Sequence, residues 1–353
     1  MRRKIKVLVV DDSVSVQKSL TQILGHDPDI EVIGCAANPY EAVSKIAENL
    51  PDVITLDIEM PRMDGLTFLR KLMNQHPISV VVISSMAGEA SDLGIKALRL
   101  GALEIITKPK MSDMGHFEEY RIRITDAVKA AAMTGPVRRR TIRENETKPD
   151  AILKSEKITK TSGTASENVI LIGASTGGTE VISYLLKNLK PDLPGILIVQ
   201  HMPGEFTGAF ARRLNLESKL EVKEAENGDL VETGKVYIAN GYQHLKLVKE
   251  DMQFKCKLEM DAMVNRHRPS VDVLFHSASH FPGKNITAVL LTGMGSDGAK
   301  GMLELYDAGA MTFAQDEESS VIFGMPKAAI KINAARKICN PAEIIHWLNN
   351  TYR

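Results

Sequence analysis

Two groups of residues in this 353-residue chain have types and spacings that could do chemistry. The first comprises Asp11, Asp12 and Asp57, with Ser84 and Lys108 further along. Three carboxylates held close together repel one another, and a hard, oxygen-seeking cation such as Mg²⁺ relieves that repulsion. A lysine and a hydroxyl supply the charge and the hydrogen bond that a phosphoryl oxygen needs. This group therefore predicts a pocket that accepts a phosphoryl group.

The second group lies in the last half of the chain and centres on Ser175. This serine stands in the run Gly-Ala-Ser-Thr-Gly-Gly, which follows an apolar segment and is typical of a tight strand-to-helix turn. His201 and Asp297 follow two other apolar segments. A serine nucleophile needs a base to take up its proton and a carboxylate to orient that base. In the glycine-rich turn before Asp297, the Met294 amide could stabilise an oxyanion.

Other histidines compete with His201 for the role of base. His244 follows a Gly-Tyr-Gln turn and is the main rival. His267, His276 and His280 lie in or near a predicted helix over 269–279, where a single histidine is more often a structural residue.

Taken alone, the pattern around Ser175 has two other interpretations. A buried turn without chemistry has the same G-x-S-x-G spacing. A dinucleotide-binding loop would need G-x-G-x-x-G, and Ser175 stands where the second glycine must let the pyrophosphate approach.

Short apolar runs alternate with helical patterns in the first third of the chain. Unbroken β-branched runs indicate a parallel sheet covered on both faces, and functional groups collect at the carboxyl ends of such strands. We therefore predict a flavodoxin-like (βα)5 domain in which each residue of the first group follows or ends a strand. The predicted strands are Ile5–Val10, Glu31–Ala36, Val53–Leu56, Val80–Ile83 and Glu104–Thr107, and the predicted helices are Val14–Leu24, Tyr40–Glu48, Leu66–Met73, Ala90–Leu100 and one after His116.

Residues 134–167 have the composition of a linker, charged at first and then rich in Lys, Thr, Ser and Gly without any aromatic residue. We therefore predict two domains, at residues 1–133 and 168–353. The second domain again alternates strand-like runs with helical segments, which predicts a doubly wound, mainly parallel α/β fold. Its predicted strands are Val169–Ile172, Ile196–Val199, Val236–Ala239 and Ala288–Leu291.

Composition argues against several classes of protein. The 44 basic and 44 acidic residues balance, so no overall field attracts nucleic acid or an anionic membrane. No apolar run approaches the roughly 20 residues of a membrane span, and Asp11-Asp12 ends the first apolar run too early for a signal peptide. Three widely spaced cysteines predict neither a disulfide framework nor a zinc site. We expect a cytoplasmic protein that neither binds nucleic acid nor inserts into membranes.

From about residue 5 to 132, the chain resembles the receiver domain of two-component response regulators. The resemblance rests on the five residues of the first group, which agree in type, order and strand-end placement, and on the run D-I-E-M-P-R-M-D-G that starts at Asp57. It implies that Asp57 accepts a phosphoryl group from a histidine kinase and that Asp11 and Asp12 bind Mg²⁺. Receivers usually carry Phe or Tyr three residues before the lysine, where this chain has Ile105. Phosphorylation should survive that change, whereas the relay of the signal could differ.

The second domain resembles the catalytic domain of the CheB family of chemotaxis methylesterases. The resemblance implies that Ser175 is the nucleophile, His201 the general base and acid, Asp297 the orienting carboxylate and Met294 the backbone oxyanion donor. It also implies hydrolysis of glutamate γ-methyl esters on chemoreceptors, with release of methanol, and in many members deamidation of receptor glutamines. No cofactor is expected for this reaction. The segments that carry the resemblance are V-I-L-I-G-A-S-T-G-G, V-Q-H-M-P, R-P-S-V-D-V-L-F and T-G-M-G-S-D-G.

The partners implied are a chemotaxis histidine kinase of the CheA type as phosphodonor and methylated chemoreceptors as substrate. Two other output domains are alternatives: a DNA-binding domain, which would need a basic recognition helix, and a nucleotide-binding domain, which the failed glycine pattern disfavours. A protein substrate requires an open cleft, and an open cleft needs a gate. We expect the unphosphorylated receiver to pack across the Ser175 edge, and phosphorylation of Asp57 to weaken that packing.

Overall fold

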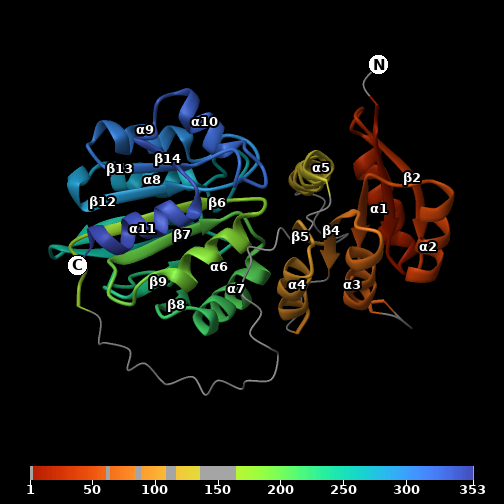
Figure 1. Cartoon of the computed structure of the whole chain (residues 1–353), viewed down its shortest axis with the longest axis horizontal. Coiled ribbons are helices and arrows are strands. Elements are labelled where there is room, and N and C mark those ends of the chain that lie inside the picture. The colour runs from red at the N-terminus through yellow and green to blue at the C-terminus, as the bar shows by residue number, and fades with distance from the viewer. Residues whose placement is uncertain (1–2, 61–63, 85–88, 109–116, 136–163, 353) are drawn as a thin grey trace.

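The computed structural model describes residues 3–60, 64–84, 89–108, 117–135 and 164–352, and it contains two α/β domains side by side (Figure 1). The elements of the N-terminal domain are β1 (Ile5–Val10), α1 (Val14–Gly25), β2 (Ile30–Ala36), α2 (Pro39–Glu48), β3 (Val53–Leu56), α3 (Gly65–Gln75), β4 (Ser79–Ser84), α4 (Glu89–Arg99), β5 (Glu104–Thr107) and α5 (Phe117–Thr134).

The five strands of the N-terminal domain form one parallel sheet in the order β2-β1-β3-β4-β5. Strands β3 and β4 are buried along their whole length, because helices cover both faces of the sheet and both faces carry apolar side chains. The flavodoxin-like prediction is confirmed, and each strand lies within one residue of its predicted bounds at either end.

The C-terminal domain is built around a parallel sheet of seven strands, and a separate antiparallel hairpin, β10–β11, packs on α8. The hairpin was not predicted, because its charged residues alternate with buried ones and leave no continuous apolar run. The elements are β6 (Val169–Ala174), α6 (Gly178–Asn188), β7 (Gly195–Gln200), α7 (Gly204–Glu217), β8 (Glu221–Glu224), β9 (Lys235–Ile238), β10 (His244–Glu250), β11 (Gln253–Glu259), α8 (Val271–Ser279), η2 (Gly283–Asn285), β12 (Ile286–Leu290), α9 (Ala299–Asp307), β13 (Met311–Gln315), α10 (Met325–Lys331), β14 (Lys337–Cys339) and α11 (Pro341–Thr351).

The order of the large sheet is β14-β13-β12-β6-β7-β9-β8, and every described pair in it is parallel. Strand β6 lies between β12 and β7, so the carboxyl ends of these three strands meet at one edge. In open α/β sheets such an edge is where ligands bind.

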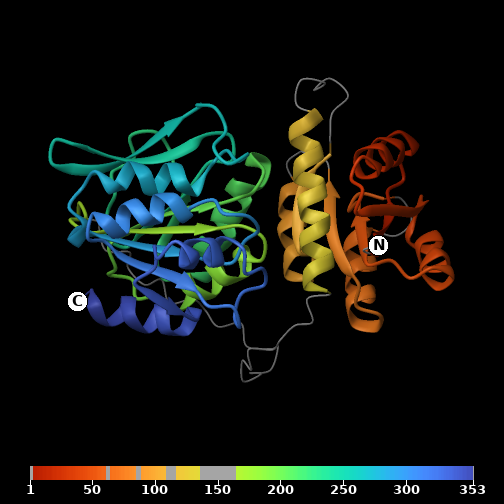
Figure 2. The same cartoon turned by 90° about the horizontal axis from the view of Figure 1, so that it is seen from above.

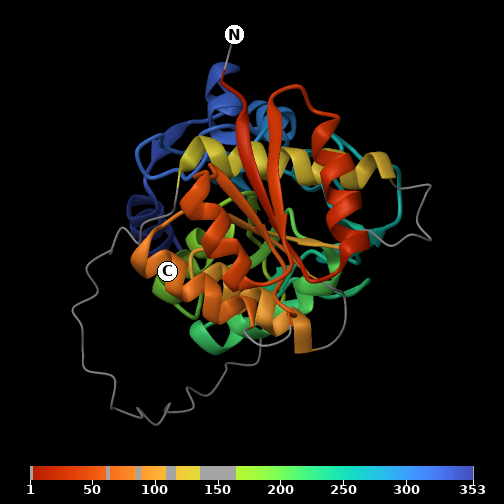
Figure 3. The same cartoon turned by 90° about the vertical axis from the view of Figure 1, so that its right-hand side faces the viewer.

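The two domains meet through α4, β5 and α5 of the first domain and through α6, α7 and the Ser175 edge of the second. Figure 2 shows α5 on the side of the first domain that faces the second, and Figure 3 shows α5 crossing in front of the second domain. Ile95, Ile105, Phe206 and Phe210 belong to one buried apolar cluster that runs across the boundary. Gly94 makes this approach possible, because a Cβ atom there would lie 2.7 Å from the Phe206 ring.

In the parts of the chain that the structure describes, no helix combines the length and apolar character needed to cross a membrane. Cys35, Cys256 and Cys339 form no disulfide. Most of the predicted linker, residues 136–163, lies outside the described residues, so the domain boundaries stay predictions.

Candidate active site

Ser175, His201 and Asp297 come from the three neighbouring strands β6, β7 and β12. The register pairs Gly173 with Leu290 and Ala174 with Gln200, so the chain leaves all three strands at the same level. The structure therefore brings the residues of the second group to one edge of the sheet. Their roles in a reaction stay predictions.

The backbone around Ser175 is held from several sides. The Ser175 amide donates to the Thr292 carbonyl at 3.0 Å, and the Ser175 carbonyl accepts from the Gly178 amide at 2.7 Å and from Gln200 Nε2 at 2.9 Å. Gly177, the N-cap of α6, has a φ of +79°, a left-handed conformation that favours glycine. The turn thus fixes a serine that is 6% exposed at the N-terminus of a helix, where negative charge is stabilised.

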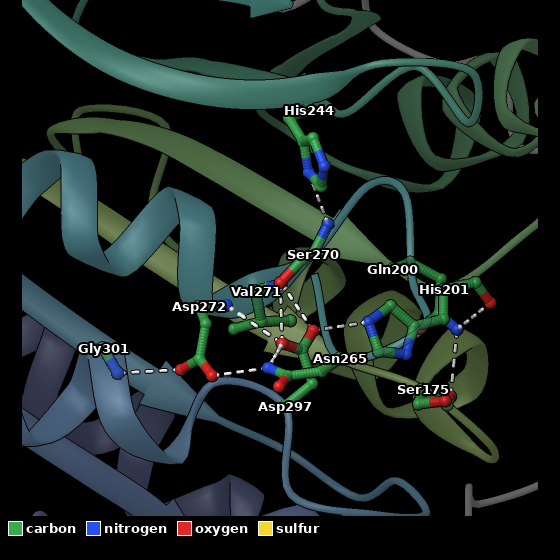
Figure 4. A network of polar contacts seen from close by, with 10 residues as sticks. All are labelled: Ser175, Gln200, His201, His244, Asn265, Ser270, Val271, Asp272, Asp297 and Gly301. Atoms are coloured by element: carbon green, nitrogen blue, oxygen red, sulfur yellow. Dashed lines mark hydrogen bonds and ion pairs between the residues drawn. The ribbon is translucent and has the colours of Figure 1, made fainter. Parts of the chain in front are cut away.

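Asp297 is the most heavily hydrogen-bonded carboxylate of the site (Figure 4). Its Oδ2 accepts from His201 Nε2 at 2.8 Å and from the Val271 amide at 2.7 Å, and its Oδ1 accepts from Asn265 Nδ2 and Ser270 Oγ, each at 2.7 Å. Burial opposes ionisation, but these donors outweigh it and hold the pKa of Asp297 below its ordinary value. An ionised carboxylate therefore faces the imidazole.

The hydrogen bond to Asp297 decides which nitrogen of His201 can act as a base. A carboxylate partner keeps the proton on Nε2 and leaves the lone pair on Nδ1. Nδ1 is buried and has no hydrogen-bond partner among the described residues, and Figure 4 shows the ring between Asp297 and Ser175. The described residues contain no hydrogen bond from the Ser175 hydroxyl to His201, and such bonds often tighten only when substrate binds.

His267 stacks on His201, with ring centroids 3.7 Å apart and planes inclined by 12°. Burial, together with the neighbouring His201, lowers the pKa of His267 to about 2, so its ring is neutral. The prediction that placed His267 in or near a helix as a structural residue missed this contact. His267 lies in the loop before α8, where Asn265 and Arg266 have φ values of 52° and 67°. The signal in the sequence was the dense polar run N-R-H-R-P-S directly before the helix.

The rival histidine, His244, stabilises the loop before α8. In the described structure it forms no hydrogen bond with Ser175. Its Nδ1 accepts from the Ser270 amide at 3.1 Å, and its Nε2 bonds the Ala262 carbonyl at 2.9 Å. Burial lowers the pKa of His244. Both nitrogens are therefore engaged in holding the segment that supports Asp297.

Met294 lies in a turn that the segment 322–325 holds in place. The Gly293 amide donates to Ile322 O at 3.0 Å, and the Gly293 carbonyl accepts from the Met325 amide at 2.8 Å. Met294 lines the same cavity of about 420 Å³ as Ser175. Its side chain packs against the apolar cluster of the N-terminal domain, so that domain covers this part of the site.

Comparison with known proteins shows the family of this chain. The family model described as CheB methylesterase matches residues 170–348, and the one described as response regulator receiver domain matches residues 7–116. A protein-glutamate methylesterase/protein-glutamine glutaminase of a group 3 operon in Rhodopseudomonas palustris is 48% identical over 352 residues, covering 98% of this chain and 97% of its own. This chain belongs to the CheB methylesterase family.

Other CheB proteins extend the comparison. A protein-glutamate methylesterase/protein-glutamine glutaminase of Anaeromyxobacter dehalogenans is 49% identical over 342 residues, which are 95% of this chain and 93% of that protein. The crystal structure of the Thermotoga maritima CheB methylesterase catalytic domain is 37% identical, covers 53% of this chain and 99% of that one, and has a TM-score of 0.51. A CheB catalytic domain as the output excludes the DNA-binding and nucleotide-binding alternatives.

The acidic pocket of the CheB receiver domain lies at the carboxyl ends of β1 and β3. Carboxylate oxygens of Asp11, Asp12 and Asp57 all lie within 4.8 Å of one another, and such a set of oxygen donors fits a hard cation like Mg²⁺. Lys108 Nζ lies 2.7 Å from Asp57 Oδ2 and 2.9 Å from Asp11 Oδ2. Burial raises the pKa of Asp57 to about 6, although Lys108 opposes this. Ser84 is the last residue of β4, and its buried hydroxyl has no hydrogen-bond partner among the described residues.

Receiver residues also form part of the wall around Ser175. The cavity is lined by Glu104 of β5 and by Arg123, Asp126 and Ala127 of α5, opposite the catalytic domain. Arg212 Nη2 of α7 pairs with an Asp92 carboxylate oxygen of α4 at 3.3 Å. The receiver therefore packs across the Ser175 edge, as the sequence-based expectation stated.

Proposed function

We propose that this chain is a phosphorylation-activated protein-glutamate methylesterase that hydrolyses glutamate γ-methyl esters on methyl-accepting chemoreceptors. The observation that carries the proposal is the His201–Asp297 hydrogen bond, which leaves His201 Nδ1 buried as a base beside Ser175. The names of the relatives, which include protein-glutamine glutaminase, support a second activity of the same site, the deamidation of receptor glutamines. The chain would act in the cytoplasm as the adaptation step of chemotaxis.

In the proposed reaction, His201 Nδ1 takes the proton of Ser175 while Oγ attacks the ester carbonyl carbon. Asp297 stabilises the imidazolium that forms, and the Met294 amide donates to the oxyanion. The C–O bond to the methoxy group then breaks, and the Nδ1 proton passes to it, so methanol leaves. Water attacks the acyl-enzyme with the same nitrogen as base, which restores the serine and yields the glutamate carboxylate. In deamidation the leaving group is ammonia.

We propose that the receiver gates this site. A CheA-type histidine kinase would phosphorylate Asp57, and Mg²⁺ held by Asp11, Asp12 and Asp57 would neutralise charge on the incoming phosphoryl group. Lys108, which pairs with Asp57 in this state, would exchange that carboxylate for a phosphoryl oxygen. Such a change weakens the packing over Ser175 and opens the cleft to a chemoreceptor.

Replacing Asp57 by Asn should abolish activation and leave the basal rate intact. Typical coupling energies predict that a phosphodonor raises the rate of the wild type about 5- to 150-fold, whereas Asp57→Asn should show a ratio near one. Methanol release from methylated receptor membranes, with and without a small-molecule phosphodonor, measures both rates.

A fragment starting at residue 168 provides the reference for the gate. Its rate should equal or exceed that of the phosphorylated full chain, because no receiver covers Ser175. Equal rates for the fragment and for the full chain with and without phosphodonor would contradict gating, while a Ser175-dependent release of methanol would still support the esterase.

Replacing His267 by Ala should slow catalysis, and replacing it by Phe should restore most of the rate. A stacked aromatic pair contributes about 0.5–1.5 kcal/mol, so the loss of kcat in His267→Ala should be roughly 2- to 13-fold. Phenylalanine keeps the stack without a titrating nitrogen. If His267→Phe is as slow as His267→Ala, the imidazole itself is needed and stacking is not the reason; the pH profile of kcat distinguishes the two.

A further inference from the structure

The receiver places a glutamate side chain beside the nucleophile of the catalytic domain. Glu104 is the first residue of β5, and its Oε2 accepts a hydrogen bond from Thr176 Oγ1 at 2.8 Å. Thr176 follows Ser175 directly, and Glu104, Ser175 and His201 line the same cavity. A glutamyl carboxylate therefore lies where the protein substrate has to present its own glutamyl group.

We propose that Thr176 marks the subsite for the glutamyl carboxyl group of the substrate and product, and that Glu104 occupies this subsite in the docked state. The inference rests on the proposed methylesterase function, because the product of that reaction is a glutamate carboxylate with the same side-chain atoms as Glu104. The docked receiver thus excludes substrate by mimicking product as well as by covering the cleft.

The electrostatics of Glu104 agree with a built subsite. Burial raises the pKa of its carboxyl group, and the hydrogen bond from Thr176 and the charge of Arg123 partly offset this effect. A buried carboxylate costs free energy unless hydrogen bonds and charges compensate. An apolar residue at this position would pack in the interface without that cost. The presence of a carboxylate is therefore explained better by its hydrogen bond with Thr176 than by domain packing alone.

The position of Glu104 also connects it to the phosphorylation pocket. Lys108, four residues further along, follows the other end of β5 and pairs with Asp57 and Asp11. Four extended residues span about 13 Å, and β5 is the edge strand of its sheet. A shift of Lys108 toward a phosphoryl group would therefore pull the strand that carries Glu104, which links the two sites through one short element.

Replacing Glu104 by Ala in the full, unphosphorylated chain should empty the subsite. A hydrogen bond to a charged group is worth about 1.5–3 kcal/mol, so methanol release should rise about tenfold or more and approach the rate of the phosphorylated wild type. Free glutarate should then bind, shift the NMR signal of the Thr176 amide and inhibit the variant. The unphosphorylated wild type should show neither effect. Adding Thr176→Val to Glu104→Ala should abolish glutarate binding.

Asp92→Ala is the matched control, because Asp92 makes an exposed ion pair across the same interface and lies outside the cavity. Exposed pairs contribute little, so this variant should stay near the basal rate and should not bind glutarate. Equal activation by Asp92→Ala and Glu104→Ala, or no glutarate binding to Glu104→Ala, would overturn the inference. Glu104→Gln keeps the size of the side chain and shows whether Glu104→Ala merely unfolds the receiver.

The two proposals fail separately in this experiment. If the phosphorylated wild type releases no methanol, the methylesterase function is wrong. If it releases methanol while Glu104→Ala neither gains activity nor binds glutarate, the esterase stands and the product-mimic role of Glu104 is wrong.

Discussion

Replacing Ser175 by Ala is expected to remove methylesterase activity almost completely. Loss of the nucleophile in a serine hydrolase typically lowers kcat by a factor on the order of 10⁶, since the acyl-enzyme can no longer form. The structure predicts little change in stability, because the Ser175 backbone carries the hydrogen bonds that hold the turn. Methanol release by the phosphorylated full chain, compared with wild type, measures the effect.

Ser183→Ala is the control for this substitution. Ser183 lies in α6, the helix that follows the same turn. Its hydroxyl donates a hydrogen bond to Glu217 Oε2 at 2.7 Å, and it does not line the Ser175 cavity. This variant should lose some stability and keep its activity. Full turnover by Ser175→Ala would show that a different residue attacks the ester.

Replacing Asp297 by Asn should have the second-largest effect, a fall in kcat of about 10⁴-fold. An amide of the same shape no longer holds the proton on His201 Nε2, so Nδ1 is no longer kept free as the base. The Asn amide would also meet the donors Asn265, Ser270 and Val271, and one unsatisfied donor costs about 1–3 kcal/mol. Rates should therefore be measured well below the unfolding temperature, and urea unfolding should be measured alongside.

Asp272→Asn separates the two effects. Asp272 is buried close by and accepts from the Gly301 amide and from Asn265, but it does not bond His201 in the described structure. We expect a comparable loss of stability with activity within about tenfold of wild type. If both variants lose activity equally, the loss comes from disorder of the loop rather than from the tautomer of His201.

Much of the fold followed from the sequence because the strands of a parallel sheet are buried on both faces. Continuous apolar runs such as Val53–Leu56 and Val169–Ile172 are therefore visible without any structure. The β10–β11 hairpin was missed for the opposite reason, since its residues alternate between buried and exposed. Chain order and strand ends also brought Ser175, His201 and Asp297 to one edge, because each directly follows or lies shortly after a predicted strand.

The supporting residues of the site were not visible in this way. Asn265, His267 and Ser270 belong to a loop whose path depends on two residues with left-handed backbone conformations and on the hydrogen bond between His244 and the Ser270 amide. No periodicity encodes such a path. The same holds for Glu104. In the sequence it is an ordinary polar residue at the start of a strand, and its contact with Thr176 depends on how the two domains pack.

The sequence by itself determined which residues gather at the two sheet edges, because strand ends place these residues and apolar patterns define the strands. Only the tertiary structure decided which nitrogen of His201 is left free, since this depends on the hydrogen bond to Asp297. It also decided what covers Ser175. Packing between domains joins residues 72 positions apart, Glu104 and Thr176, and such contacts arise from the shapes of two folded surfaces that no local pattern records.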